Sequence, residues 1–333
     1  MNTLVKIASL ALLLIFFSAS ADANRLKIAT LAPAGTTWME ELKAGANLIA
    51  ERTGGRVILK FYPGGVMGND QSVHRKIKIG QLHGGAFTPG GLAQVDSSIQ
   101  SLGLPMMFKS FDEVDYVRAK MDPVIKQQME AKGFVLLGIS EGGFVRILSK
   151  KPMQSLESIR NSKVWVPAGD RIGQIAMSAL GITPISLPIS DVFTGLQTGL
   201  IETVTVNPTA AIAFQWHTST SFMTEVPISY LIGVMAIQKK AFDKLSPDDQ
   251  QIVREEIGKV FKRLDTINRS DNQAAKAALQ NQGITFVTPD PGEIERWKSI
   301  SDQSIEEMVE TGVISSEIVD QVRGHLQSFH NNQ

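Results

Sequence analysis

One serine stands in a pattern that hydrolases use. Ser140 lies in Gly138-Ile139-Ser140-Glu141-Gly142, which matches the G-x-S-x-G elbow, where a serine attacks an acyl carbon. The elbow needs a strand before the serine and a helix after it. Residues 134–138 can form that strand, but residues 143–148 also have the composition of a strand, and no Asp and His follow in an evident triad order. We therefore expect a glycine-rich crossing between domains here, and a hydrolase using Ser140 stays open as the alternative.

The other residue types that do chemistry are missing or scattered. The chain has no cysteine, which excludes disulfides, thiolate metal sites and a cysteine nucleophile. Its five histidines, at positions 74, 83, 217, 325 and 330, lack the spacing of metal ligands such as H-E-x-x-H. No phosphate-binding loop or dinucleotide fingerprint occurs. We expect no catalytic residues, no metal and no cofactor, so the function must lie in binding.

The N-terminus indicates export. Lys6 precedes an apolar run from Ile7 to Phe17, and the small residues after it end in Ala21-Asp22-Ala23. The run is shorter than the roughly 20 apolar residues that span a bilayer. This pattern predicts a signal peptide over residues 1–23 and a chain that starts near Asn24, with an uncleaved anchor as the alternative.

Charge and length limit what the exported chain can be. Lys and Arg number 33, and Asp and Glu also number 33, so the formal net charge is zero and no nucleic-acid partner is expected. The remaining chain of about 310 residues, with 43% hydrophobic residues in the whole sequence, predicts two domains with ordinary cores.

The elements that must position a site follow the pattern of β-α-β units. Thr37 and Glu40 have the spacing of a capping box, so a helix is expected to begin at Thr37 and to end at Gly54-Gly55. The other elements expected in this half are strands over 26–31, 57–62 and 84–90 and a helix over 70–82.

The same pattern returns after residue 133. Strands are expected over 134–139 and 163–166, and a helix over 171–180. Ser246-Pro247-Asp248-Asp249 then gives an N-cap, a first-turn proline and two carboxylates at the positive end of a helix dipole. No strong helix breaker follows until Gly283. At 1.5 Å per residue, such a helix would reach roughly 50 Å, long enough to brace two domains.

Two stretches carry a resemblance to a known family. The run from Ser155 to Pro208 contains "NSKVWVPAGD" and "GITPISLPISDVFTGLQTGLIE", and the earlier stretch is "FYPGGVMGNDQSVHRKIKIGQLHGG". They resemble the DctP-type solute receptors of TRAP transporters, the tripartite ATP-independent periplasmic carriers. The most specific match is Leu196-Gln197-Thr198-Gly199 followed by Ile201-Glu202, and the likeness extends over about residues 26–310.

The resemblance implies a fold and a function. The fold would be α/β, a two-domain periplasmic binding protein fold with a hinge and a long domain-spanning helix. Domain I would take residues 24–144 plus about 232–270, and domain II residues 145–231 plus about 271–333. The protein would capture a small organic solute in the periplasm and deliver it to the small and large membrane subunits of a TRAP carrier. A ligand-sensing subunit of a signalling system is a further alternative.

The resemblance also points to site residues. The family's hallmark arginine, which binds the ligand carboxylate, falls on Trp165, and a second basic position falls on Val145, with Arg146 beside it. Neighbouring strand residues point to opposite faces, so Arg146 can substitute only if the register differs by one. Trp165 comes at the carboxyl end of its strand, just before Pro167, where open α/β sheets bind ligands. A pocket role is therefore expected for Trp165, and a core role stays open.

Six further positions complete the expected ligand site. Phe87, Thr88 and Asn207 follow from the family match, with a core role open for Phe87 and a capping role for Asn207. Trp38 and Trp216 would add aromatic surface, although either can be structural. The expected ligand is an aromatic or apolar organic acid, whose carboxylate is held by Arg146, Arg171 or backbone donors. An uncharged apolar solute is the second choice.

Overall fold

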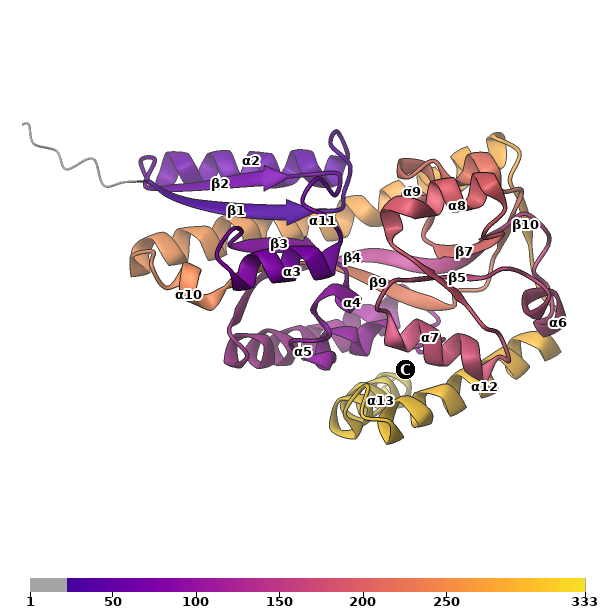
Figure 1. The fold of residues 1–333 in the computed structure, drawn as a ribbon. Helices are drawn as coiled ribbons and strands as arrows, with labels where there is room; N and C mark the ends of the chain where they lie inside the picture. The colour runs from indigo at the N-terminus through magenta and orange to yellow at the C-terminus, as the bar shows by residue number, and fades with distance from the viewer. Residues whose placement is uncertain (1–22, 333) are drawn as a thin grey trace, which may run out of the picture.

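The structure is a computed structural model that describes residues 23–332. The expected signal peptide, residues 1–23, lies outside the described residues except for Ala23. The described chain forms two α/β domains side by side, linked by a strand and a long helix that pass through both (Figure 1). None of the described helices is both long and apolar enough to cross a membrane.

The first domain is built on a mixed sheet in the order β2-β1-β3-β9-β4. β1 pairs in parallel with β2 and β3, and β9 runs antiparallel to both β3 and β4. The bounds of these strands are β1 Asn24–Thr30, β2 Val57–Tyr62, β3 Gly84–Phe87, β4 Phe134–Ser149 and β9 Ser229–Gln238.

Alternating residues of this sheet face two cores. Leu26 and Ile28 of β1 enter a core shared with α2 (Thr37–Arg52) and α11 (Pro247–Asn281), whereas Ala29 enters the core on the opposite face. Side chains of a strand alternate between its faces, so this pattern means that helices cover the sheet on both sides.

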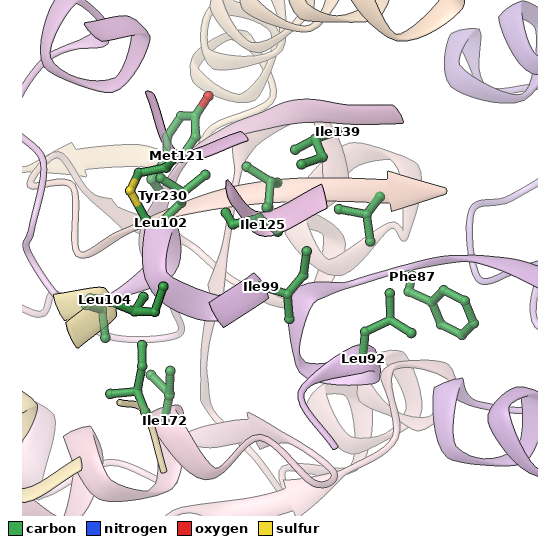
Figure 2. Close-up of a cluster of buried hydrophobic side chains, with 14 of the residues drawn as sticks. Phe87, Leu92, Ile99, Leu102, Leu104, Met121, Ile125, Ile139, Ile172 and Tyr230 are labelled. Atoms are coloured by element: carbon green, nitrogen blue, oxygen red, sulfur yellow. The ribbon is translucent and has the colours of Figure 1, made fainter. Parts of the chain in front are cut away.

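The core on the opposite face, called the α5-side core here, lies against α5 (Phe111–Ala131). Figure 2 shows part of this core, in which Phe87 lies at one side of the view and Met121 and Tyr230 lie at the other. Ile172 belongs to this cluster although it comes from a helix of the second domain, so the two domains touch here. The other elements of this region are α3 Asp70–Lys78, α4 Pro89–Leu92, η1 Ser97–Gly103 and α10 Lys239–Phe242.

The second domain continues the sheet through the end of β4. There β4 pairs with β7 and β8 in antiparallel fashion, and β8 pairs with β10 in parallel. β5 and β6 form a separate two-stranded parallel sheet. The bounds are β5 Trp165–Pro167, β6 Ile185–Leu187, β7 Thr203–Val206, β8 Phe222–Thr224, β10 Thr285–Val287, α6 Leu156–Arg160, α7 Arg171–Ala179, α8 Val192–Thr198, α9 Pro208–Ala213, α12 Pro291–Glu310, η2 Ile189–Asp191 and η3 Trp216–Ser219.

The expected long helix is confirmed. α11 contains 35 residues, begins after the Ser246 N-cap and runs through both domains (Figure 1). Val260 and Phe261 of its first half pack in the first domain, and Leu279 of its second half packs in the second.

The G-x-S-x-G stretch lies inside one continuous strand. β4 spans 16 residues with register shifts near Gly138 and Gly143, and no helix follows Ser140. A Cβ atom on Gly138 would lie 2.1 Å from the Phe261 ring, so glycine is needed for the close approach of α11. The stretch is therefore a domain crossing and not a nucleophile elbow.

Three details differ from the sequence analysis. α2 begins at Thr37 as expected, but its N-cap is Thr36, whose hydroxyl accepts from Met39 N, so the expected capping box of Thr37 and Glu40 is wrong. The strand expected over 163–166 begins at Trp165. The last helix, α13 (Ser316–Asn331), packs on α5 of the first domain, which differs from the expected placement of the tail in domain II.

Candidate functional site

A cavity of about 470 Å³ has walls from both domains. The first domain contributes the ends of β1 and β3 and the start of α2. The second contributes β5, β7 and the segment around α9, and the crossing strands β4 and β9 complete the wall. Six of the eight expected site residues line it: Trp38, Phe87, Thr88, Trp165, Asn207 and Trp216.

Arg146 does not line the cavity, and the expectation that it replaces the family's cation is corrected here. Val145 lines the cavity, and its neighbour Arg146 points to the opposite face, as strand alternation requires. Its Nε donates to Glu225 O at 3.1 Å and its Nη1 to Phe144 O at 3.4 Å. Burial lowers the pKa of this guanidinium, and Glu225 opposes that effect.

Arg171 also lies outside the cavity. It is exposed at the first turn of α7 and lines a neighbouring pocket of about 410 Å³, together with Asp70 and Gln71. Arg146 thus faces away from the aromatic residues of the site, and Arg171 lies in an adjoining pocket that shares Thr88, Pro167 and Asp170 with the cavity wall.

Trp165 combines the two roles left open by the sequence. Its side chain is 2% exposed and belongs to the core of the second domain, yet it also lines the cavity. Its Nε1 donates to Leu187 O at 2.9 Å, and its ring meets Trp216 edge to face with centroids 5.3 Å apart. Trp216 in turn stacks on Phe214 at 5.4 Å. The wall is therefore a rigid aromatic surface backed by a core.

Asn207 and Thr88 occupy helix N-cap positions at the cavity wall, and only the Asn207 side chain makes the capping hydrogen bond. Asn207 Oδ1 accepts from Ala210 N at 2.7 Å, and its Nδ2 donates to Gly142 O on the crossing strand. Thr88 precedes α4 and donates its hydroxyl to Asp70 Oδ2 at 2.9 Å. Burial raises the pKa of Asp70 to about 6. Both expected residues are therefore already bonded within the protein.

Phe87 and Trp38 lie on the first-domain side. Phe87 is 3% exposed and packs in the α5-side core, so its core role is present beside its place on the wall. Trp38 packs edge to face on Phe261, with ring centroids 5.9 Å apart.

Several wall residues were not expected from the sequence. Glu141 accepts from Tyr230 Oη at 3.1 Å and from Arg269 Nε at 2.8 Å. Burial raises the pKa of Glu141, and Arg269 and Tyr230 act in the opposite direction. Glu141 occupies a variable position inside the rejected serine motif, and Tyr230 is a single aromatic within a long strand, so no sequence pattern marked either as a site residue. Other unexpected polar residues of the wall include Asp170, Asn268 and Asn272.

Ser140 lines the cavity but has none of the partners of a nucleophile. Its side chain is fully buried, and its Oγ has no hydrogen-bond partner among the described residues. A catalytic serine needs a base within hydrogen-bond reach. Within residues 23–332 no group of His, Cys, Asp and Glu could hold a metal ion either.

Comparison with known proteins gives a family match over most of the chain. The model of the DctP family, bacterial extracellular solute-binding protein family 7, matches residues 28–311. A C4-dicarboxylate-binding periplasmic protein, DctP, from Rhodobacter capsulatus is 22% identical over 270 residues, which cover 79% of this chain and 80% of that protein.

Solved structures share the fold. The sugar acid binding protein DctPAm from Advenella mimigardefordensis, in complex with galactonate, has a TM-score of 0.85 at 17% identity, covering 92% of this chain and 99% of that one. A TRAP periplasmic solute binding protein from Desulfovibrio salexigens with bound orotic acid has a TM-score of 0.84 at 14% identity, with the same coverage of 92% and 99%.

Proposed function

Because the chain belongs to the DctP family of bacterial extracellular solute-binding proteins, we propose that it captures a small organic molecule in the periplasm for a TRAP carrier. Its partners would be that solute and the small and large membrane subunits of the carrier. The family is one of binding proteins, which agrees with the expected absence of enzymatic activity.

The observation that carries this proposal is the cavity between the two domains. Ligand sites of this kind bury most of a small molecule in a concave and mainly apolar space, and about 470 Å³ lies within their usual size. Walls from both domains, with a strand and a helix passing between them, suit closure about a hinge.

The body of the ligand is proposed to be aromatic or otherwise apolar. The relatives described above bind a dicarboxylate, a sugar acid and orotic acid, so organic acids are the reference class for this chain. Here, however, Trp165, Trp216 and Trp38 supply apolar faces in the wall, and Trp165 stands where the family is expected to have its arginine. Flat apolar groups pack well against such faces.

The test is to identify the molecule that the protein retains. The secreted protein is purified from the bacterium that produces it, unfolded, and the released small molecules are identified by mass spectrometry. We expect one organic compound at about one per chain, and the purified compound should bind again to the stripped protein by calorimetry. Protein that was unfolded, dialysed and refolded before extraction serves as the background. Absence of any retained compound above that background would count against a receptor.

A further inference from the structure

The wall of the cavity has no cationic side chain. None of the described residues that line it is Lys, Arg or His, whereas Glu141 and Asp170 both line it. The positions expected to carry the family's cations hold Trp165 and Val145, and Arg146 faces away. A carboxylate that leaves water without a cation or several hydrogen-bond donors loses more solvation energy than it recovers.

The neutral donors of the wall are mostly committed to the protein's own acceptors. A neutral site could hold a carboxylate only through N–H and O–H groups that point at it. The committed pairs are Asn207 Nδ2 and Asn272 Nδ2 to Gly142 O, Asn268 Nδ2 to Glu141 O, Trp165 Nε1 to Leu187 O, Tyr230 Oη to Glu141 Oε2, Ser229 Oγ to Gly103 O and Thr209 Oγ1 to Asn272 Oδ1.

Other wall residues have side-chain donors outside these pairs. The hydroxyls of Thr36, Thr88 and Thr203 also pair within the protein. The hydroxyls of Thr30, Ser140, Thr205 and Ser301 donate to no acceptor within the described chain, but a hydroxyl can donate or accept and so favours neither charge. Gln100 has no side-chain hydrogen bond recorded within the described chain, but its amide can donate or accept and so favours neither charge. The Trp297 indole makes no hydrogen bond of ordinary length there. It does help, after the Leu156 backbone N–H, to keep the pKa of Glu293 below its usual range, so it already lies beside a carboxylate.

Two buried polar side-chain atoms of the wall that can accept a hydrogen bond lack a partner in the described structure. Glu141 and Ser140 are fully buried and adjacent on β4, and Glu141 Oε1 and Ser140 Oγ have no hydrogen-bond partner within residues 23–332. A carboxylate oxygen can only accept, and a serine hydroxyl can accept and donate. A buried acceptor without a partner costs about 1–3 kcal/mol, which a ligand donor would recover.

Charges behind this part of the wall also disfavour an anion. Two guanidinium groups, those of Arg118 and Arg269, are surrounded by four carboxylates in the described structure. The pairs are Arg118 with Asp122 and Asp265, and Arg269 with Asp115 and Glu141. Lys126 also acts on Asp122, and the four carboxylates still outnumber these three cations, so the cluster supplies no net positive charge to attract an anion.

We infer that the cavity takes an organic molecule without negative charge, whose hydroxyl, amide or ammonium group donates to Ser140, which lies beside Trp38, while its apolar body packs on the tryptophans. This inference rests on the proposed function for the location of the site. It proposes a ligand that donates a hydrogen bond in place of the organic acids that the relatives bind.

The test compares three probes that share one apolar body: 3-phenylpropan-1-ol, 3-phenylpropylamine and 3-phenylpropanoate. Binding is measured by calorimetry and by the fluorescence of the wall tryptophans. We expect the alcohol or the amine to bind at least about tenfold more tightly than the carboxylate, the effect of one charged group left without a partner. Equal or tighter binding of 3-phenylpropanoate would overturn the inference and leave the receptor function standing. Lack of response to all three would also overturn it, because an apolar cavity of this volume should retain a phenylpropyl group.

A pair of serine variants locates the donor contact. Ser140→Ala should weaken binding of the tighter probe roughly threefold to tenfold, the usual effect of losing one hydrogen bond. Ser101→Ala is the matched control, because Ser101 is also fully buried with an unpartnered Oγ but does not line the cavity. Equal effects of the two substitutions would contradict the assigned contact.

A variant that adds a positive charge to the wall tests whether the missing cation sets the ligand preference. Trp165→Arg restores a cation to the wall, and it should reverse the order so that 3-phenylpropanoate binds best. Because Trp165 is buried, this variant is first checked for a native circular dichroism spectrum. If it fails to fold, Val145→Arg, on the neighbouring part of the wall, takes its place. An unchanged preference in a folded variant would overturn the inference.

Discussion

Trp165 is both a wall of the cavity and a member of a core, so its truncation should have two separate effects. Trp165→Ala should lower the free energy of unfolding without ligand by about 3–5 kcal/mol, as expected for a large buried side chain. It should also weaken binding of the retained ligand by about 1–3 kcal/mol through the lost aromatic contact. Denaturant melts of the ligand-free protein and calorimetric titration measure the two effects.

Trp165→Phe is the control for that experiment. It keeps an aromatic ring but loses the hydrogen bond from Nε1 to Leu187 O, which is worth about 1 kcal/mol. A stability loss in Trp165→Ala without any change in affinity would show that the indole supports the fold and does not touch the ligand.

Asp70 gives a prediction for pH. Burial raises its pKa in the folded protein to about 6 from an ordinary value of 3.8. The folded state therefore binds this proton more tightly than the unfolded state, and the stability from that proton is present at low pH and is lost as the pH rises from about 4 to 6. Asp70→Asn should remove this loss, which is at most about 3 kcal/mol.

Urea melts of the wild type and Asp70→Asn between pH 4 and 8 test this prediction, because groups common to both proteins cancel in the difference. The variant should gain stability relative to the wild type as the pH rises. A difference that is constant over this range would show that the Asp70 carboxyl titrates normally.

The contact between β4 and α11 explains the glycine in the serine motif. Gly138→Ala would force a Cβ atom against the Phe261 ring, and such overpacking costs about 1–3 kcal/mol of stability. In a Phe261→Leu background the same substitution should cost clearly less, because the ring is gone. Urea melts of the four proteins of this double-mutant cycle give the coupling. Equal costs in both backgrounds would refute the steric explanation.

Local signals in the sequence were enough for many elements. The N-cap and first-turn proline at Ser246-Pro247, with no breaker until Gly283, located α11 closely. The flaw in the serine motif was also visible, since a strand and not a helix follows it. Cap residues and periodicity act between near neighbours, so such features can be predicted.

The contacts that the sequence did not predict depend on distant parts of the chain. Whether Arg146 or Val145 faces the cavity is fixed by the pairing of β4 with β7 and β9, and the family match alone suggested only the position. The burial of Glu141 depends on Arg269, which is far away in sequence. The packing of α13 on α5 likewise joins segments about 200 residues apart, without any pattern that marks it in advance.

The whole molecule is expected to change its shape with ligand. In the described structure Ile172 of the second domain packs in the α5-side core of the first, and we expect bound ligand to favour this contact. The radius of gyration from small-angle scattering should match this structure when ligand is saturating and should be larger without ligand. Identical scattering profiles in the two states would argue against a hinge.

Neither domain is a continuous piece of chain, because β4 and α11 each contribute residues to both. Fraying of one domain would break the backbone pairing and helix packing that the other needs. The protein should therefore unfold in one cooperative step, with equal calorimetric and van't Hoff enthalpies. Expression of either half alone should give an insoluble or disordered product. For a receptor in the periplasm, this arrangement means that the mobility needed to admit a ligand does not require any part of the chain to become an independent, protease-sensitive unit.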